Sequence, residues 1–438
     1  EEDLTQDPDV LDTWFSSWLW PIATFDGIRN PDNEDINYYY PTNDLVTGPD
    51  ILFFWVARMI IAGYEFKGKL PFENVYLTGI VRDKQGRKMS KQLGNSPDAL
   101  ELIERFGADG VRSGLLFSAP AGNDLLFDEK LCEQGRNFCN KIWNAYRLVE
   151  GWTVIGQSAI GNRQSAVNSN LLAIDWFNAR INQTIIEIQD HFTKFRISDA
   201  LLSLYNLVWN DFCSKYLEII KPDFEQPIDK ATFEATIEIF EKLTCLLHPY
   251  MPFITEEIWQ ALAKRNEGES ICRTEFPKGG DVNTELLSSF DVMFEVVSKI
   301  REVRNVKQLS PKIVLPLAIK TDNKVRYENV ESIIEKLANT ETISYVSAKV
   351  DGAISFVVKA DEFFITLEGE IDVEAELETA QKDLEYNLGF KKATEAKLSN
   401  ERFVANAKPE LVERERQKLA DAESKIKALE ERIASLKK

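Results

Sequence analysis

The sequence has few of the residues that build metal centres and disulfide frameworks. It contains five cysteines and two histidines among 438 residues. No two cysteines form a Cys-x-x-Cys pair, and His191 and His248 do not lie one helical turn from each other. We therefore expect reduced thiols, structural histidines and no protein-bound metal.

Long apolar segments are also missing. No stretch approaches the roughly 20 apolar residues that a membrane span requires, and the first residues carry no signal-peptide pattern. We expect a cytoplasmic protein without membrane contact. Because the sequence begins with Glu1 rather than methionine, we expect a processed chain or a piece of a longer one.

Positive charge is scarce but concentrated. The formal net charge is -19, which argues against a general nucleic-acid binder while allowing local basic patches. Five of the ten residues at 82–91 are Lys or Arg, and Asp83 is the one acid among them. Gly86 allows a close backbone approach, and lysines supply mobile charges, so the run Gly86-Arg87-Lys88-Met89-Ser90-Lys91 is typical of a phosphate site. The alternative is a solvated hairpin tip.

The hydrophobic pattern changes several times along the chain, which is too long for one core. Residues 51–61 are apolar nearly all round and predict a helix buried in an α/β layer. Apolar spacing at 170–265 predicts a helical bundle, and strand-like runs at 313–367 predict a small α/β unit. Heptads at 373–388 and 412–436 predict an antiparallel coiled-coil hairpin, with a parallel dimer as the alternative.

Six separated motifs resemble, in the same order, segments of the valyl-tRNA synthetases, a family of class I aminoacyl-tRNA synthetases. One letter departs, because Gln92 stands where the family usually has serine. The motifs are DPDVLDTWFSS at 7–17, TGPDILFFWVARM at 47–59, RKMSKQLGNSP at 87–97, GRNFCNKIWN at 135–144, HPYMPFITEEIW at 248–259 and NERFVANA at 400–407.

The resemblance implies a site for ATP, with Mg²⁺ as its counter-ion. Lys91 and then Lys88 would be the catalytic groups that hold the triphosphate, while Met89 and Ser90 would place backbone groups near the nucleotide. Gly48 and Asp50 would lie beside the nucleotide and amino-acid sites. Asp50 could hold a ribose hydroxyl or the substrate ammonium, and it could also cap a helix.

The resemblance also implies sites for valine and for valine tRNA. Trp14 and Trp55, with Asp50, would wall the valine pocket, although on the bare sequence ordinary core packing explains each tryptophan better. The expected RNA contacts are a basic stripe and the coiled-coil tip, for which solvated charge is the alternative; they are Lys299, Arg301 and Arg304, and Arg402 and Phe403.

The implied fold class is mixed α/β and α, in five parts. They are the C-terminal half of a Rossmann-like catalytic domain at 1–120, connecting helices at 121–165, an anticodon-binding bundle at 166–288, a small α/β domain at 289–368 and a coiled-coil arm at 369–438. The implied function is part of a monomeric ligase that joins valine to its tRNA through valyl-adenylate. The chain lacks a His-Ile-Gly-His element and an editing domain, so we expect it to be inactive alone. The alternatives are an isoleucine or leucine enzyme and a non-catalytic tRNA-binding scaffold.

Overall fold

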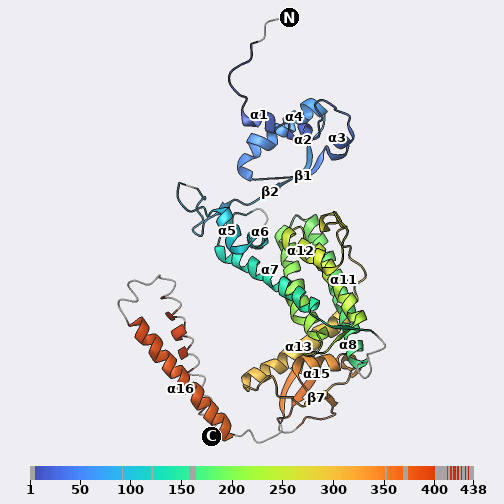
Figure 1. The fold of residues 1–438 in the computed structure, drawn as a ribbon, viewed down its shortest axis with the longest axis vertical. Coiled ribbons are helices and arrows are strands. Elements are labelled where there is room, and N and C mark those ends of the chain that lie inside the picture. Colours follow the sequence, from blue (N-terminus) through green and yellow to red (C-terminus); the bar gives the residue numbers. More distant parts are fainter. Residues whose placement is uncertain are drawn as a thin grey trace.

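The computed structural model describes residues 5–90, 92–119, 123–156, 164–350, 353–367 and 373–399, with scattered positions between 412 and 433. The described elements follow one another from an N-terminal lobe, through a helical body, to a small mixed sheet and a long separate helix (Figure 1). No helix among these residues has the length and apolar character needed to cross a membrane.

The N-terminal lobe is a parallel two-stranded sheet with short helices around it. Strand β1 pairs with β2 so that Thr42 lies opposite Phe72 and Thr47 opposite Leu77. The crossover between them passes through three successive helical segments, since two parallel strands can be joined only by a long connection. The elements are α1 (Thr13–Ser17), α2 (Trp20–Ala23), α3 (Glu34–Tyr39), β1 (Thr42–Thr47), η1 (Pro49–Ile51), η2 (Leu52–Val56), α4 (Ala57–Lys67) and β2 (Phe72–Leu77).

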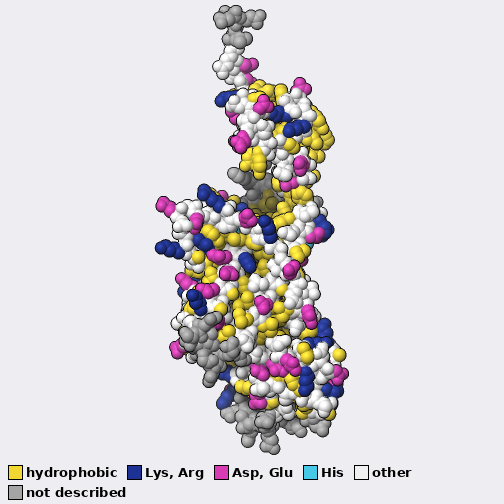
Figure 2. Space-filling view, turned by 90° about the vertical axis from the view of Figure 1, so that its right-hand side faces the viewer, with side chains coloured by type: hydrophobic (Ala, Val, Ile, Leu, Met, Phe, Trp, Pro, Cys, Tyr) yellow, Lys and Arg dark blue, Asp and Glu magenta, His cyan; other side chains and the backbone are white. Residues whose placement is uncertain are grey.

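The prediction of a fully buried helix at 51–61 is wrong. Val56 and Met59 pack against Phe72, but Phe53 is 80% exposed and Ile61 is 62% exposed. A sheet of two strands covers one side of the segment and leaves the other open. Apolar side chains are accordingly visible on the surface of this lobe (Figure 2).

A pair of packed helices connects the lobe to the helical body. Here β3 (Val81–Arg82) pairs in parallel with β4 (Leu125–Leu126). Between these strands the chain forms α5 (Ala99–Phe106) and α6 (Ala108–Phe117), and after β4 it forms α7 (Glu129–Glu150). Helices α6 and α7 cross closely at Gly110 and Gly135. A Cβ atom on Gly135 would lie 2.1 Å from the Gly110 carbonyl oxygen, so this crossing requires glycine.

The helical bundle predicted at 170–265 is confirmed as a set of packed helices. Its core is aromatic, with Trp176 stacked on Phe290 at a centroid distance of 4.9 Å and Phe177 on Tyr216 at 5.0 Å. Its elements are β5 (Val154–Ile155), α8 (Gln164–Thr193), α9 (Ile197–Asn206), η5 (Leu207–Tyr216), α10 (Leu217–Ile220), β6 (Ile228–Asp229), α11 (Lys230–Leu247), α12 (Pro252–Leu262), η6 (Ile271–Arg273) and α13 (Thr284–Val306).

A small mixed sheet and two helices follow the bundle. The strand order is β8-β7-β10-β9, in which β7 and β8 are parallel and the other pairs antiparallel. Phe363 and Ile365 on β10 are fully buried. The elements are β7 (Leu317–Lys320), α14 (Val325–Glu328), α15 (Glu331–Ala338), β8 (Ser344–Tyr345), β9 (Ile354–Val358) and β10 (Asp361–Ile365).

The last described helix is α16 (Val373–Leu398), which lies apart from the body (Figure 1). Lys391 pairs with Glu423 at 2.9 Å, and Lys397 pairs with Glu415 at 3.2 Å. Going along α16 from Lys391 to Lys397, the residue number of the acidic partner decreases from 423 to 415. The two segments therefore run in opposite directions at these positions. Residues 400–411, where the tip was predicted, lie outside the described residues.

Candidate active site

The basic loop after β3 is a short hairpin. The Asp83 N–H donates to the Arg87 carbonyl oxygen at 3.0 Å, and the Gly86 N–H donates to the Asp83 carbonyl oxygen at 2.9 Å. Gly86 has a φ of +78°, a left-handed conformation that costs a residue with a side chain roughly 1–2 kcal/mol. The glycine is therefore needed for the turn itself.

The Asp83 carboxylate stabilises this hairpin by accepting several hydrogen bonds. It accepts hydrogen bonds from the backbone N–H groups of Gln85 at 3.0 Å and Arg87 at 2.8 Å. It also accepts from Arg87 Nε at 2.7 Å and from Asn95 Nδ2 at 2.9 Å. The hydrogen bond from Asn95 and those from Arg87 lower the pKa of Asp83 to about 2, so this carboxylate stays ionised at neutral pH.

Two cations of the loop have acidic partners about 40 residues further along the chain. Arg82 pairs with Asp124, and Lys84 Nζ lies 3.1 Å from Asp128 Oδ1. Both acids belong to the segment around β4, about 40 residues further along, so the spacing of the loop alone gave no sign of them. They hold the hairpin against the body.

Lys88 has its acidic partner in the N-terminal lobe rather than beside β4. Its Nζ lies 3.5 Å from Asp50 Oδ2, and the two side chains are 72% and 61% exposed. This contact joins the loop to η1 of the N-terminal lobe, so it brings two of the predicted site residues together. Asp50 does not cap the helix, since Gly48 occupies the position before η1 and no side chain caps it. Lys91 lies outside the described residues.

Met89 and Ser90 lie between the loop and the helices behind it. Met89 packs against a buried cluster that includes Phe106. The Ser90 N–H donates to Asn95 Oδ1 at 2.9 Å, and Ser90 Oγ accepts from the Leu93 N–H at 3.2 Å. Beside them is a cavity of about 970 Å³ with mixed charge, lined in part by Asp83, Arg87, Met89, Asn95, Arg105 and Arg136.

Trp14 and Trp55 each pack against an aromatic ring, but against different ones. The Trp14 ring lies 6.3 Å from Phe54, and the Trp55 ring lies 5.9 Å from Trp20, measured between centroids. Trp55 Nε1 donates to the Ser17 carbonyl oxygen at 3.3 Å. Both tryptophans are half-buried, so they pack η2 against α1 while keeping part of each ring accessible.

The predicted basic stripe on α13 is wrong for Arg304. That side chain is 5% exposed, and its guanidinium donates to the carbonyl oxygens of Ser310 at 3.1 Å, Ala338 at 2.9 Å and Asn339 at 2.8 Å. It therefore joins α13 to the end of α15 and to the loop that follows α13. Lys299 pairs with Glu302 at 2.8 Å on the surface.

Arg301 keeps an exposed position while donating to the Leu337 carbonyl oxygen at 3.0 Å. It shares the surface of α13 with Lys299 rather than with Arg304. The two remaining predicted RNA contacts, Arg402 and Phe403, lie outside the described residues.

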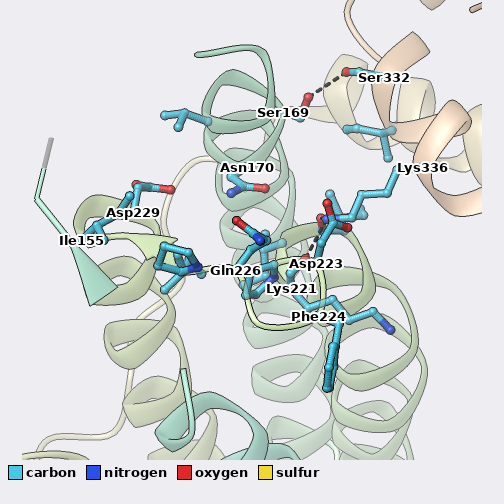
Figure 3. A pocket seen from close by; sticks show the side chains of 17 residues that line it. Ile155, Ser169, Asn170, Lys221, Asp223, Phe224, Gln226, Asp229, Ser332 and Lys336 are labelled. Carbon is cyan, nitrogen blue, oxygen red and sulfur yellow. Dashed lines mark hydrogen bonds between the residues drawn. The ribbon is translucent and has the colours of Figure 1, made fainter. Parts of the chain in front are cut away.

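A second cavity, of about 720 Å³, lies between the bundle and α15 (Figure 3). At its rim Ser169 Oγ and Ser332 Oγ are 2.7 Å apart. Lys336 Nζ donates to the carbonyl oxygens of Ile219 at 2.6 Å and Lys221 at 2.7 Å, and burial lowers its pKa. Lys336 thus serves the joint between α10 and α15, and no sequence motif marked it.

Asp109 on α6 is a further residue that the motifs did not indicate. Its carboxylate accepts from the N–H of Ile254 at 2.7 Å and of Phe253 at 3.4 Å. These are the first free N–H groups of α12, within the HPYMPFITEEIW motif. Beside them Arg112 donates to the carbonyl oxygens of Tyr250 at 3.0 Å and Pro249 at 3.1 Å. The motif therefore serves to fasten α6 to the bundle.

Three family models match the chain. Residues 1–128 match the tRNA synthetases of class I (I, L, M and V), residues 175–319 match the anticodon-binding domain of tRNA ligase, and residues 372–437 match the valyl tRNA synthetase tRNA binding arm. The chain belongs to the class I tRNA synthetases of this group.

The individual relatives of this chain are named as valine–tRNA ligases. The chain is 54% identical over 436 residues to the valine–tRNA ligase of Parabacteroides distasonis, covering 100% of this chain and 49% of that protein. It is 37% identical to the valine–tRNA ligase of Chlorobaculum tepidum, covering 98% of this chain and 49% of that protein. A solved LeuRS–tRNA–LeuAMS complex from Agrobacterium radiobacter K84 aligns with a TM-score of 0.46 at 20% identity, over 65% of this chain and 34% of that chain. Within its class the chain belongs to the valine–tRNA ligase family, and it spans about half the length of the curated relatives it matches.

Proposed function

We propose that this chain is the portion of a valine–tRNA ligase that carries the mobile cations for ATP and the surfaces for valine tRNA. The whole enzyme would act as a cytoplasmic monomer, activating valine with ATP and Mg²⁺ and passing it to tRNA through valyl-adenylate. The similarity to valine–tRNA ligases over the full chain supports this proposal, and the match to a valyl tRNA-binding arm favours it over an isoleucine or leucine enzyme.

The observation that carries the proposal is the pairing of Lys88 with Asp50. It places the basic loop directly over η1, where Gly48 and Asp50 form the second motif. An exposed ion pair contributes at most about 1 kcal/mol. Lys88 can therefore leave Asp50 for a triphosphate, and Asp50 then becomes available to a ribose hydroxyl or to the valine ammonium.

In this proposal Lys88 and Lys91 act mainly in the transition state. As valine attacks the α-phosphate and the bond to pyrophosphate breaks, negative charge grows on the phosphate oxygens. A flexible ammonium group can tighten its contact as that charge develops, which is the differential binding that speeds a reaction. Met89 and Ser90 would set the position of the loop backbone beside the nucleotide.

Trp14 and Trp55 would form walls of the valine pocket, since each keeps part of a rigid ring accessible. Lys299 and Arg301 would contact the tRNA backbone from the surface of α13, joined by Arg402 and Phe403 of the arm. Arg304 is not included, because its guanidinium is committed to three carbonyl oxygens.

Valine-dependent ATP–pyrophosphate exchange by the intact ligase that contains this chain tests the proposal. Lys88→Ala is expected to lower kcat roughly 10²–10³-fold, as removal of one charge-stabilising donor does. Lys84→Ala is the matched control, because Lys84 lies on the same hairpin but pairs with Asp128. Equal activity of the two variants would show that Lys88 has no role in the chemistry.

The chain by itself is expected to bind tRNA without supporting exchange. Its affinity for valine tRNA and for bulk tRNA, compared at one salt concentration, separates specific recognition from general attraction. Exchange by the chain alone would contradict our assignment of it as a partial enzyme. A non-catalytic scaffold would show inactive intact protein with normal tRNA affinity.

A further inference from the structure

Three potential metal ligands meet at one end of the helical bundle. His248 follows the last residue of α11, Glu256 lies on α12 and Cys272 lies in η6. One ligand atom from each lies within 4.8 Å of the others. His248 Nε2 is 3.1 Å from Cys272 Sγ. The three residues are 8 and 16 positions apart, so no local spacing in the sequence indicated them.

Hydrogen bonding fixes the tautomer of His248. Thr255 Oγ1 donates its single proton to the Met251 carbonyl oxygen at 2.7 Å. The contact of 2.8 Å between Thr255 Oγ1 and His248 Nδ1 must therefore have Nδ1–H as the donor. Nε2 then carries the lone pair, and it faces Cys272. Histidines that bind metals have this arrangement, with one nitrogen on the metal and the other N–H held by a fixed acceptor.

Glu256 is also held in place. Its Oε1 accepts from Gln260 Nε2 at 2.8 Å, and its Oε2 accepts from Ser270 Oγ at 2.7 Å and from the Ile271 N–H at 3.2 Å. Oε1, which accepts one hydrogen bond, retains a further lone pair for a metal ion. These bonds orient the carboxylate beside the imidazole and the thiol, in the way that outer partners orient metal-binding carboxylates.

We propose that His248 Nε2, Glu256 and Cys272 Sγ bind one Zn²⁺ ion, with a fourth position open to water. In tetrahedral zinc sites the nitrogen and sulfur ligands lie roughly 3.5 Å apart, given bond lengths of about 2.1 and 2.3 Å. The observed 3.1 Å needs an adjustment of only a few tenths of an ångström.

The charges also match. A neutral imidazole, a carboxylate and a thiolate balance the two charges of Zn²⁺, and binding would release the thiol proton to solvent. Cys272 is exposed, which gives the ion a path into the site. The ion would tie η6 and its flanking loops to α11 and α12. This inference is independent of the proposed function, because none of its residues lies in the loop or the valine pocket.

Cobalt substitution is the direct test. The full chain, reduced and stripped of metal with a chelator, is titrated with Co²⁺ and then with Zn²⁺. One equivalent of Co²⁺ is expected to give the visible bands of a tetrahedral ion and a thiolate charge-transfer band, and Zn²⁺ should displace it. Cys272→Ser should abolish the charge-transfer band. Cys245→Ser should keep it, because Cys245 contacts Thr274 and lies outside the cluster.

A second variant removes the outer support without touching a ligand. Thr255→Val deletes the acceptor for Nδ1–H and should weaken Zn²⁺ affinity roughly 10–100-fold. Circular dichroism of the metal-free variants checks that each is folded, and the exposed Cys272→Ser change is the one least able to disturb the core. A cobalt spectrum without a thiolate band, or one unchanged in Cys272→Ser, would show that His248 and Cys272 share a simple hydrogen bond and would overturn the proposal.

Discussion

Asp109→Ala should loosen the joint between α6 and the helical bundle. The carboxylate accepts from the Ile254 N–H at 2.7 Å and the Phe253 N–H at 3.4 Å, and it is 4% exposed. A hydrogen bond to a charged group contributes about 1.5–3 kcal/mol, and a carboxylate at a helix N-terminus adds about 0.3–1 kcal/mol. Burial raises the pKa of Asp109, so keeping it ionised offsets part of this gain. We expect a net loss of about 2–3 kcal/mol.

Native-state hydrogen exchange at the Ile254 amide measures this loss where it arises. A change of that size should speed exchange roughly 30–150-fold. Asp98→Ala is the matched control, since Asp98 also accepts from two helix N–H groups, at 2.8 and 3.3 Å, but is exposed at the start of α5. That variant should lose about 1 kcal/mol and leave Ile254 protected. Unchanged protection of Ile254 in Asp109→Ala would refute the reasoning.

Three further changes probe other joints and the loop. Gly135→Ala should lower stability by about 1–3 kcal/mol in urea, because a Cβ would lie 2.1 Å from a carbonyl oxygen; Gly156→Ala, with nothing within 4 Å, should not. Asp83 has a pKa of about 2 in the folded chain, so its ionised form contributes fully to stability above its ordinary pKa of about 3.9, and this contribution is lost as the pH falls toward 2. The difference in unfolding free energy between the unmodified chain and Asp83→Asn should therefore narrow from pH 5 to pH 3, and a constant difference would contradict this assignment. Arg304→Met should cost about 1–3 kcal/mol in thermal unfolding, by leaving buried carbonyls unpaired, whereas equal loss in Lys299→Met would exclude a special role for burial.

The helices were predictable because their signals are local. Apolar residues at i, i+3 and i+4 continue through α8 and α11, and the buried side chains of these helices follow that spacing. The segment at 51–61 shows the limit of the method. Its composition measures how apolar the segment is, but it cannot say what covers it, and Phe53 remains 80% exposed in the described lobe.

The site was less predictable because its contacts join distant residues. The motif marked the basic loop, yet Asp124 and Asp128, which pair with two of its cations, lie in no motif. Arg304 has the helical spacing of an exposed basic stripe, but its guanidinium is buried because it donates hydrogen bonds to carbonyl oxygens beyond residue 309. The partner of His248 lies 24 residues away at Cys272. Spacing rules detect ligands on one helix and miss ligands that only the fold brings together.

The loop thus contains two kinds of cation with different physical roles. Arg87 is bound to a carboxylate that is buried, accepts four hydrogen bonds and has a pKa of about 2, so removing it would leave Asp83 with unmet interactions. Lys88 and Asp50 are both largely exposed and 3.5 Å apart, and an exposed pair of this kind contributes at most about 1 kcal/mol. An anion with several charges competes with Asp50 at little cost, whereas it competes poorly with Asp83. Arg87 therefore shapes the loop, and Lys88 is the described loop cation that is free to change partners.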